Sequence, residues 1–279
     1  MSQRISSFSN DGLTFDVIDS GPIDGDVVVL LHGFPERASS WDAVAQRLHA
    51  EGFRTLAPDQ RGYSPGARPP RRRDYTVDKL VGDVAALIEL TGGPVHLAGH
   101  DWGSMVAWSL AAARHDLVRT LTAFSVPHPA AYTYALTHST QGLKSWYMGF
   151  FQLPRIPELL AGWRGGPLEK WISAGGMTQA DVDRFSHEIV EYGALPGALG
   201  WYRALPFADR AAPTRVAAPT TMVWSDEDMF IGEASLEGSP RFVDADYELV
   251  VLKGVTHWIP TQASDAAADA ILERVRSIG

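Results

Sequence analysis

A glycine-flanked aspartate is the residue of this chain best placed to do covalent chemistry. Asp101 lies in residues 99–103 (Gly-His-Asp-Trp-Gly), after an apolar run at 95–98 and before a helix-like run at 102–113. A strand-turn-helix of this kind is a nucleophile elbow, in which a sharp turn exposes one side chain at the top of a parallel sheet. The usual serine forms an acyl-enzyme, whereas a carboxylate attacks an electrophilic carbon and forms an alkyl-enzyme ester. We therefore expect Asp101 to be a carboxylate nucleophile.

A histidine and a group of acidic residues follow two later strand-like runs. His257 comes shortly after the run 247–252, and acidic residues at 226–228 directly follow the run 220–224. Catalytic groups gather where parallel strands end, and nucleophile, acid and base occur here in the chain order known for elbow enzymes. We expect His257 to be the base. Position alone leaves three candidates for the acid that orients it, namely Asp226, Glu227 and Asp228.

Residues 32–36 (His-Gly-Phe-Pro-Glu) end another buried strand-like run and suit one half of an oxyanion hole. The backbone N–H of Phe34 would be one donor, and that of Trp102, directly after the nucleophile, would be the other. Gly33 is equally explained by a tight turn that needs glycine for conformational reasons. The isomer of the Phe34–Pro35 bond is left open by the sequence.

Strand and helix signals alternate along the first part of the chain, which favours β-α-β units and a mainly parallel sheet. The strand-like runs are residues 13–20, 27–32, 55–58, 95–98 and 121–126, and the helix-like runs are 39–50, 76–90 and 102–113. Aromatic-rich helical pieces then replace the strands, until 220–224, 247–252 and a helix over 263–278 resume the pattern. We predict an α/β protein with a core of residues 1–127 and 216–279 and an inserted helical cap of residues 128–215.

Composition excludes several classes of protein. The chain has 279 residues and a formal net charge of −9, which argues against binding to nucleic acid. It has no cysteine, so disulfides and thiolate metal sites are excluded. No apolar run reaches the roughly 18 residues of a membrane span, and the polar first residues lack the apolar core of a signal peptide. We expect a cytoplasmic protein with no membrane partner, no cofactor and no metal.

Five segments together resemble the α/β-hydrolase superfamily over nearly the whole chain. They are residues 32–36, 58–63, 99–103, 224–228 and 254–258. The aspartate at the elbow, followed by tryptophan, resembles the branch that contains epoxide hydrolases and haloalkane dehalogenases. The resemblance implies an α/β-hydrolase fold with a helical cap. It also selects Asp228 as the acid, because in that branch the acid stands four residues after a tryptophan such as Trp224.

Two tyrosines of the predicted cap resemble the pair that points at the substrate oxygen in epoxide hydrolases. They are Tyr147, in Trp-Tyr-Met-Gly-Phe-Phe-Gln, and Tyr202, in Trp-Tyr-Arg. A phenol with a pKa of about 10 stays protonated at neutral pH and can donate to an alkoxide that would otherwise leave poorly. The sequence departs from the family pattern at Gly200, where asparagine is frequent, and at Met148, where a polar residue is common. We expect Trp102, Met148 and Phe151 to contact the substrate.

These features predict an epoxide hydrolase that converts a small hydrophobic epoxide to a vicinal diol through an ester on Asp101. One alternative is a haloalkane dehalogenase, which would use the same nucleophile without the tyrosines. Another is a catalytically silent homologue that binds a hydrophobic ligand under its cap, because fold alone does not guarantee activity.

Overall fold

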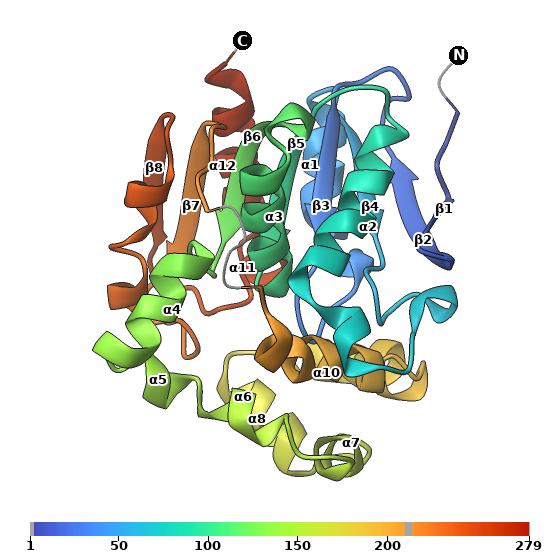
Figure 1. Cartoon of the computed structure of the whole chain (residues 1–279), viewed down its shortest axis with the longest axis vertical. Helices are drawn as coiled ribbons and strands as arrows, with labels where there is room; N and C mark the ends of the chain where they lie inside the picture. Colours follow the sequence, from blue (N-terminus) through green and yellow to red (C-terminus); the bar gives the residue numbers. More distant parts are fainter. Residues whose placement is uncertain (1–2, 210–213, 279) are drawn as a thin grey trace.

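A single eight-stranded sheet forms the centre of the computed structural model, which describes residues 3–209 and 214–278 (Figure 1). The strands lie in the order β1-β2-β4-β3-β5-β6-β7-β8. Strands β3 to β8 run parallel to one another, while β2 pairs antiparallel with both β1 and β4. The strands are β1 Ser7–Asn10, β2 Leu13–Ser20, β3 Val27–Leu31, β4 Arg54–Pro58, β5 Val95–His100, β6 Val118–Phe124, β7 Thr220–Ser225 and β8 Tyr247–Leu252. The predicted α/β class and mainly parallel sheet are confirmed.

Three strands differ from their predicted form, and one of them, β5, runs to His100 whereas residues 95–98 were expected. Strand β1 was not predicted, because only Phe8 of its four residues is buried and a short polar edge strand has no clear apolar pattern. Strand β6 begins at Val118 and ends at Phe124, whereas residues 121–126 were expected. It ends early because Ser125 has a φ of 64°, which no extended strand can continue.

Helices cover both faces of the sheet (Figure 1). Helices α2 (Val77–Glu89) and α3 (Trp102–Ala113) pack on one face, and α1 (Asp42–Ala50) and α12 (Ser264–Arg276) pack on the other. The predicted helix over 39–50 is a 3-10 turn in its first residues, Ala38–Trp41. The buried strands thus have apolar cover on both sides, as a parallel sheet requires.

A helical segment, which we call the cap, joins β6 to β7 and lies at the end of the molecule opposite the chain termini (Figure 1). No strand occurs in its described residues 129–207. Its elements are α4 Pro129–His138, α5 Gln141–Lys144, α6 Trp146–Phe150, α7 Ile156–Ala161, α8 Pro167–Ala174, α9 Gln179–Phe185, a π-helix Ser186–Glu191, α10 Leu195–Ala204 and a 3-10 turn Leu205–Phe207. The domain limits at 127 and 215 stay a prediction.

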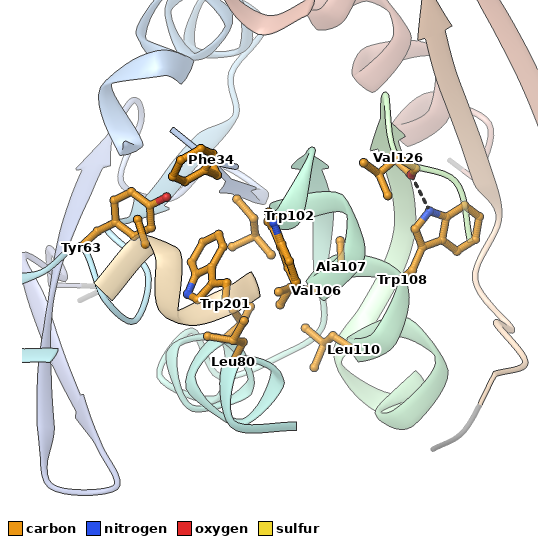
Figure 2. Close-up of a cluster of buried hydrophobic side chains, with 14 of the residues drawn as sticks. Phe34, Tyr63, Leu80, Trp102, Val106, Ala107, Trp108, Leu110, Val126 and Trp201 are labelled. Carbon is orange, nitrogen blue, oxygen red and sulfur yellow. Dashed lines mark hydrogen bonds between the residues drawn. The ribbon is translucent and has the colours of Figure 1, made fainter. Parts of the chain in front are cut away.

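Helix α10 attaches the cap to the core through Trp201 (Figure 2). Its indole N–H donates to the carbonyl oxygen of Arg61 at 2.7 Å. Its ring lies 5.1 Å from that of Tyr63 and 5.8 Å from that of Trp102, between centroids. Since Trp102 begins α3 directly after the predicted nucleophile, this contact brings the cap against the elbow.

The described helices are short. The two longest, α2 and α12, have 13 residues each. Within residues 3–209 and 214–278, no helix is long and apolar enough to cross a membrane. The same residues hold no cluster of three or more histidine, cysteine, aspartate or glutamate side chains that could bind a metal ion.

Candidate active site

Asp101 occupies a strained turn between β5 and α3. Its φ of 53° and ψ of −118° lie outside the regions that side-chain-bearing residues prefer. Such strain costs about 1–3 kcal/mol and is typical of functional turns. Glycine at 99 permits the turn, because a Cβ there would collide with the carbonyl oxygen of Gly103. Because β5 and α3 approach each other so closely, the chain turns sharply at Asp101 and leaves the sheet there.

The structure brings the three predicted groups together. The Nε2 atom of His257 lies 3.5 Å from Oδ2 of Asp101, and its Nδ1 atom lies 2.7 Å from Oδ2 of Asp228. Asp226 instead accepts a hydrogen bond from the Gly254 N–H at 2.8 Å. Asp228 is therefore the acidic residue of the 226–228 group that contacts the imidazole, as the resemblance implied.

Backbone and neighbouring side chains fix both members of the His–Asp pair. The other carboxylate oxygen of Asp228 accepts hydrogen bonds from the N–H groups of Phe230 and Ile231, at 2.7 and 2.9 Å. The carbonyl oxygen of His257 accepts from Ser125 Oγ, at 2.9 Å. These hydrogen bonds hold the Asp228 carboxylate and the backbone of His257 in position.

The site carries a buried positive charge between two negative ones. Burial alone would lower the pKa of His257, but Asp228 and Asp101 outweigh it and raise the pKa to about 10. Burial opposes ionisation of Asp101 too, yet the hydrogen bond and charge of His257 hold its pKa below the usual value. The resting site therefore holds an imidazolium and an ionised Asp101 near neutral pH.

The backbone N–H of Phe34, which is a predicted oxyanion donor, contacts the predicted nucleophile. Its N–H donates to Oδ1 of Asp101 at 2.8 Å, and the Phe34–Pro35 peptide bond is cis. A Cβ on Gly33 would collide with the Asp101 side chain, and the φ of Gly33 is not positive, so close approach and not turn geometry requires glycine. The N–H of Trp102 belongs to the first residue of α3, where helices leave N–H groups without an intrahelical acceptor. Its role as the second oxyanion donor stays a prediction.

Two helices of the cap place Tyr147 and Tyr202 side by side. Their ring centroids are 6.0 Å apart, and the Tyr202 ring lies 5.1 Å from Trp102 and 5.2 Å from Phe34. Both side chains are buried. Burial, and then the nearby charge of Asp101, raises the pKa of Tyr202 well above its usual value, and burial has the same main effect on Tyr147. Both phenols are therefore held protonated.

The three predicted substrate contacts are placed differently. Trp102 and Phe151 lie among the buried rings, and Phe151 is 4.9 Å from Tyr202 between centroids. The sulfur of Met148, by contrast, accepts a hydrogen bond from the Tyr132 hydroxyl at 3.5 Å. That contact directs Met148 toward α4, and its predicted contact with substrate stays a prediction.

Several residues next to the site were not predicted. Glu36 is buried, and its Oε2 lies 3.3 Å from Nδ1 of His100, whose Nε2 is 2.9 Å from the His257 carbonyl oxygen. Gln152 donates to the carbonyl oxygen of Tyr202 at 2.6 Å. Glu36 and His100 lie within the predicted site segments 32–36 and 99–103, and that position was the signal that could have found them.

The departure at Gly200 has a steric reason. A Cβ at this position of α10 would lie 2.8 Å from the ring of Tyr75. Tyr75 is itself buried and donates its hydroxyl to the carbonyl oxygen of Pro69 at 2.7 Å. The side chain that is frequent here in the family would collide with this ring.

Comparisons with known proteins agree with this fold. The profile of the alpha/beta hydrolase family matches residues 28–270. The chain belongs to this family and to its epoxide hydrolase branch, whose members are hydrolases that act on an ether bond.

Individual relatives and solved structures show how similar this chain is to known proteins. The chain is 34% identical to the AB hydrolase superfamily protein YfhM of Bacillus subtilis, over 96% of each chain. It is 31% identical to epoxide hydrolase 3 of Xenopus tropicalis, over 90% of this chain and 71% of the relative. Among solved structures, an epoxide hydrolase from hot-environment metagenomes has a TM-score of 0.84 at 29% identity, covering 98% of this chain and 97% of its own. An epoxide hydrolase of Vigna radiata has a TM-score of 0.80 at 27% identity, with 99% and 97% covered.

Proposed function

We propose that this protein is an epoxide hydrolase that works through an alkyl-enzyme ester on Asp101. The observation that carries the proposal is an aspartate at the elbow within reach of a buried His257–Asp228 pair. A carboxylate nucleophile suits an electrophilic carbon. Two protonated tyrosines suit the alkoxide that epoxide opening creates.

The first step forms the ester. A carboxylate oxygen of Asp101 attacks one oxirane carbon, the bond between that carbon and the ring oxygen breaks, and the oxygen takes a proton from Tyr147 or Tyr202. In net, this proton comes from the His257 imidazolium, which becomes neutral as the phenol is restored. Burial of the site keeps bulk water from competing for the electrophile.

The second step hydrolyses the ester. Alkylation removes the charge of Asp101, which is one of the causes that raise the pKa of His257, so that pKa falls and the neutral imidazole becomes a competent base. It takes a proton from water as the water oxygen attacks the ester carbonyl carbon. The N–H groups of Phe34 and Trp102 stabilise the oxyanion. The diol leaves with one proton, and Asp101 returns as a carboxylate beside the imidazolium.

The relatives named as epoxide hydrolases support the same reaction for this chain. The buried tyrosine pair favours epoxides over haloalkanes, because a halide departs without needing a proton. Small hydrophobic epoxides fit a site walled by Phe34, Trp102 and Phe151.

Trapping the ester tests the proposal directly. The His257→Gln variant, incubated separately with an epoxide panel and a haloalkane panel, is weighed as intact protein by mass spectrometry. We expect a gain equal to a whole epoxide, and no gain in the Asp101→Asn/His257→Gln control. A gain equal to an alkyl halide minus hydrogen halide would indicate dehalogenation. No adduct with either panel, from a folded variant, would contradict the proposed mechanism.

A further inference from the structure

The solvent-facing side of helix α7 is apolar. Ile156 and Leu159 are 45% and 73% exposed and lie three residues apart, which places them on one helical face. Trp163, 61% exposed, lies two residues beyond the end of the helix at Ala161. The opposite side of the helix buries Pro157 and Ala161. A surface helix normally presents polar residues to water, so this face is the reverse of the usual pattern.

Neighbouring elements extend this face into a larger patch. Trp146 on α6 is 59% exposed and its ring lies 6.1 Å from that of Trp171 on α8, while α8 packs against α7. These helices lie at the end of the molecule opposite the chain termini (Figure 1). We call the following residues the cap-end patch: Trp146, Leu153, Ile156, Leu159 and Trp163. Contiguous exposed apolar patches of this kind mark interaction sites.

The charge around the patch is opposite to that of the whole chain. Residues 139–177 contain four basic and two acidic side chains, although the chain carries a net charge of −9. Glu158 pairs with Arg203 at 2.6 Å, and Glu169 is buried and accepts from Ser186 Oγ at 2.9 Å, so neither acidic group is left free near the patch.

Three of these four basic groups face solvent, while Lys144 is half-buried and donates to the carbonyl oxygens of Asp228 and Met229. Arg155 and Lys170 are exposed and make no ion pair with residues 3–209 and 214–278. Arg164 is exposed as well and lies 3.7 Å from both Glu169 and Asp183. The cap-end patch is therefore apolar at its centre and has unneutralised positive charge beside it.

We propose that the cap-end patch binds the surface of a lipid bilayer that contains anionic phospholipid. Tryptophan is enriched at the level of the lipid headgroups, apolar side chains enter the headgroup boundary, and lysine and arginine meet lipid phosphates. The expectation of no membrane partner rested on the lack of a spanning segment, and binding at the surface needs none. A symmetric second copy is disfavoured, because it would bring like basic groups together.

The patch is joined to the active site by short connections. Gln152 and Arg203 tie the α6–α7 segment to α10, through the carbonyl oxygens of Tyr202 and Leu153. Helix α6 itself carries Tyr147. Bound to a bilayer, the cap would present this side of the molecule to lipophilic substrates dissolved in the lipid. Only that consequence rests on the proposed epoxide hydrolase function; the binding surface does not.

Vesicle flotation at low ionic strength tests the proposal. The full chain is mixed with vesicles of phosphatidylcholine alone or with phosphatidylglycerol added, and the floated fraction is measured. We expect binding to the anionic vesicles, reduced at least tenfold in Leu159→Gln/Trp163→Ser. Arg155→Gln/Lys170→Gln should lose binding by about fivefold for each charge removed, and raised salt should do the same to the original chain.

Matched measurements separate lipid binding from misfolding and from self-association. Leu90→Gln alters a residue of similar exposure, 58%, at the end of α2 and should bind as the unchanged chain does. Each variant should keep its thermal unfolding midpoint. No flotation with anionic vesicles would overturn the proposal. So would sedimentation showing a dimer that Leu159→Gln/Trp163→Ser dissociates, which would assign the patch to a second copy.

Discussion

At the scale of single residues, the site is defined by the charge shared among Asp101, His257 and Asp228. Two carboxylates on opposite ring nitrogens hold the imidazole charged in spite of its burial. A charged imidazole is no base, so the proposed cycle needs a change of charge before hydrolysis. Esterification of Asp101 provides that change, since it removes one of the two negative neighbours.

Neutralising Asp101 should therefore lower the pKa of His257. In the unchanged protein we expect the His257 imidazole, followed by NMR of labelled histidine, to lose its proton near pH 10; in Asp101→Asn the midpoint should be lower. Its contribution to stability should be complete below pH 6.5 and be lost as the pH rises toward 10, because folding raises this pKa above 6.5. An equal midpoint in both proteins would exclude this charge coupling.

The phenol groups of Tyr147 and Tyr202 should act in ring opening. Tyr147→Phe and Tyr202→Phe should each lower the rate of ester formation by about 10²-fold, a usual size for a lost proton donor. Single-turnover kinetics with an epoxide measure this step. Tyr134→Phe is the matched control, because that side chain is 65% exposed on the cap. Unchanged rates in both buried variants would remove the tyrosines from the mechanism.

At the scale of elements, the elbow depends on how closely backbone segments approach one another. The turn at Asp101, the end of β5 and the loop after β3 converge where two glycines, Gly33 and Gly99, leave no room for a Cβ. This close packing brings the N–H of Phe34 into hydrogen-bond contact with Asp101. The same segments thus supply the strain, the nucleophile and the predicted oxyanion donor.

Adding one methyl group in this crowded loop should destabilise the protein. We expect Gly33→Ala to lower the free energy of unfolding by about 1–3 kcal/mol, as overpacking does in other proteins, and to reduce turnover by displacing Asp101. Gly93→Ala is the control, because a Cβ there meets no atom within 4 Å. Urea denaturation measures the free energy of unfolding of both variants. Equal stability of the two variants would show that the loop after β3 accommodates the added methyl group without loss of stability.

At the scale of the whole molecule, the site exists only while the cap is seated on the core. The core supplies Asp101, Asp228 and His257, and the cap supplies Tyr147 and Tyr202. Trp201 secures this arrangement from the position next to Tyr202, through the Arg61 carbonyl oxygen. Stability and chemistry are thus coupled through adjacent residues of α10.

Removing the indole donor should therefore affect both properties. Trp201→Phe leaves the buried Arg61 carbonyl oxygen without its partner, and we expect a loss of about 1–3 kcal/mol in the free energy of unfolding together with lower turnover. Thermal unfolding and steady-state kinetics measure these effects. Trp163→Phe alters an exposed tryptophan of the same cap and should change neither. A fully active Trp201→Phe would show that the cap is positioned by other contacts.

The sequence by itself determined the features that depend on local pattern. Alternation of apolar runs predicted the parallel sheet and its flanking helices, and the glycines around Asp101 predicted the elbow. The change from strands to aromatic-rich helices predicted the cap. Local periodicity records which residues face the core, so these elements could be found without knowing what they pack against.

Only the tertiary structure decided which groups meet. Local pattern leaves Asp226, Glu227 and Asp228 equivalent. The family resemblance selected Asp228, and the path of the loop after β7 brings it to His257. The burial of Glu36 and His100 and the exposure of the apolar residues of α7 likewise depend on the tertiary fold. The distance between segments far apart in the chain is set by the order of the strands and by the position of the cap on the core. Burial of a side chain and its choice of partner therefore follow from the assembled fold and not from local pattern.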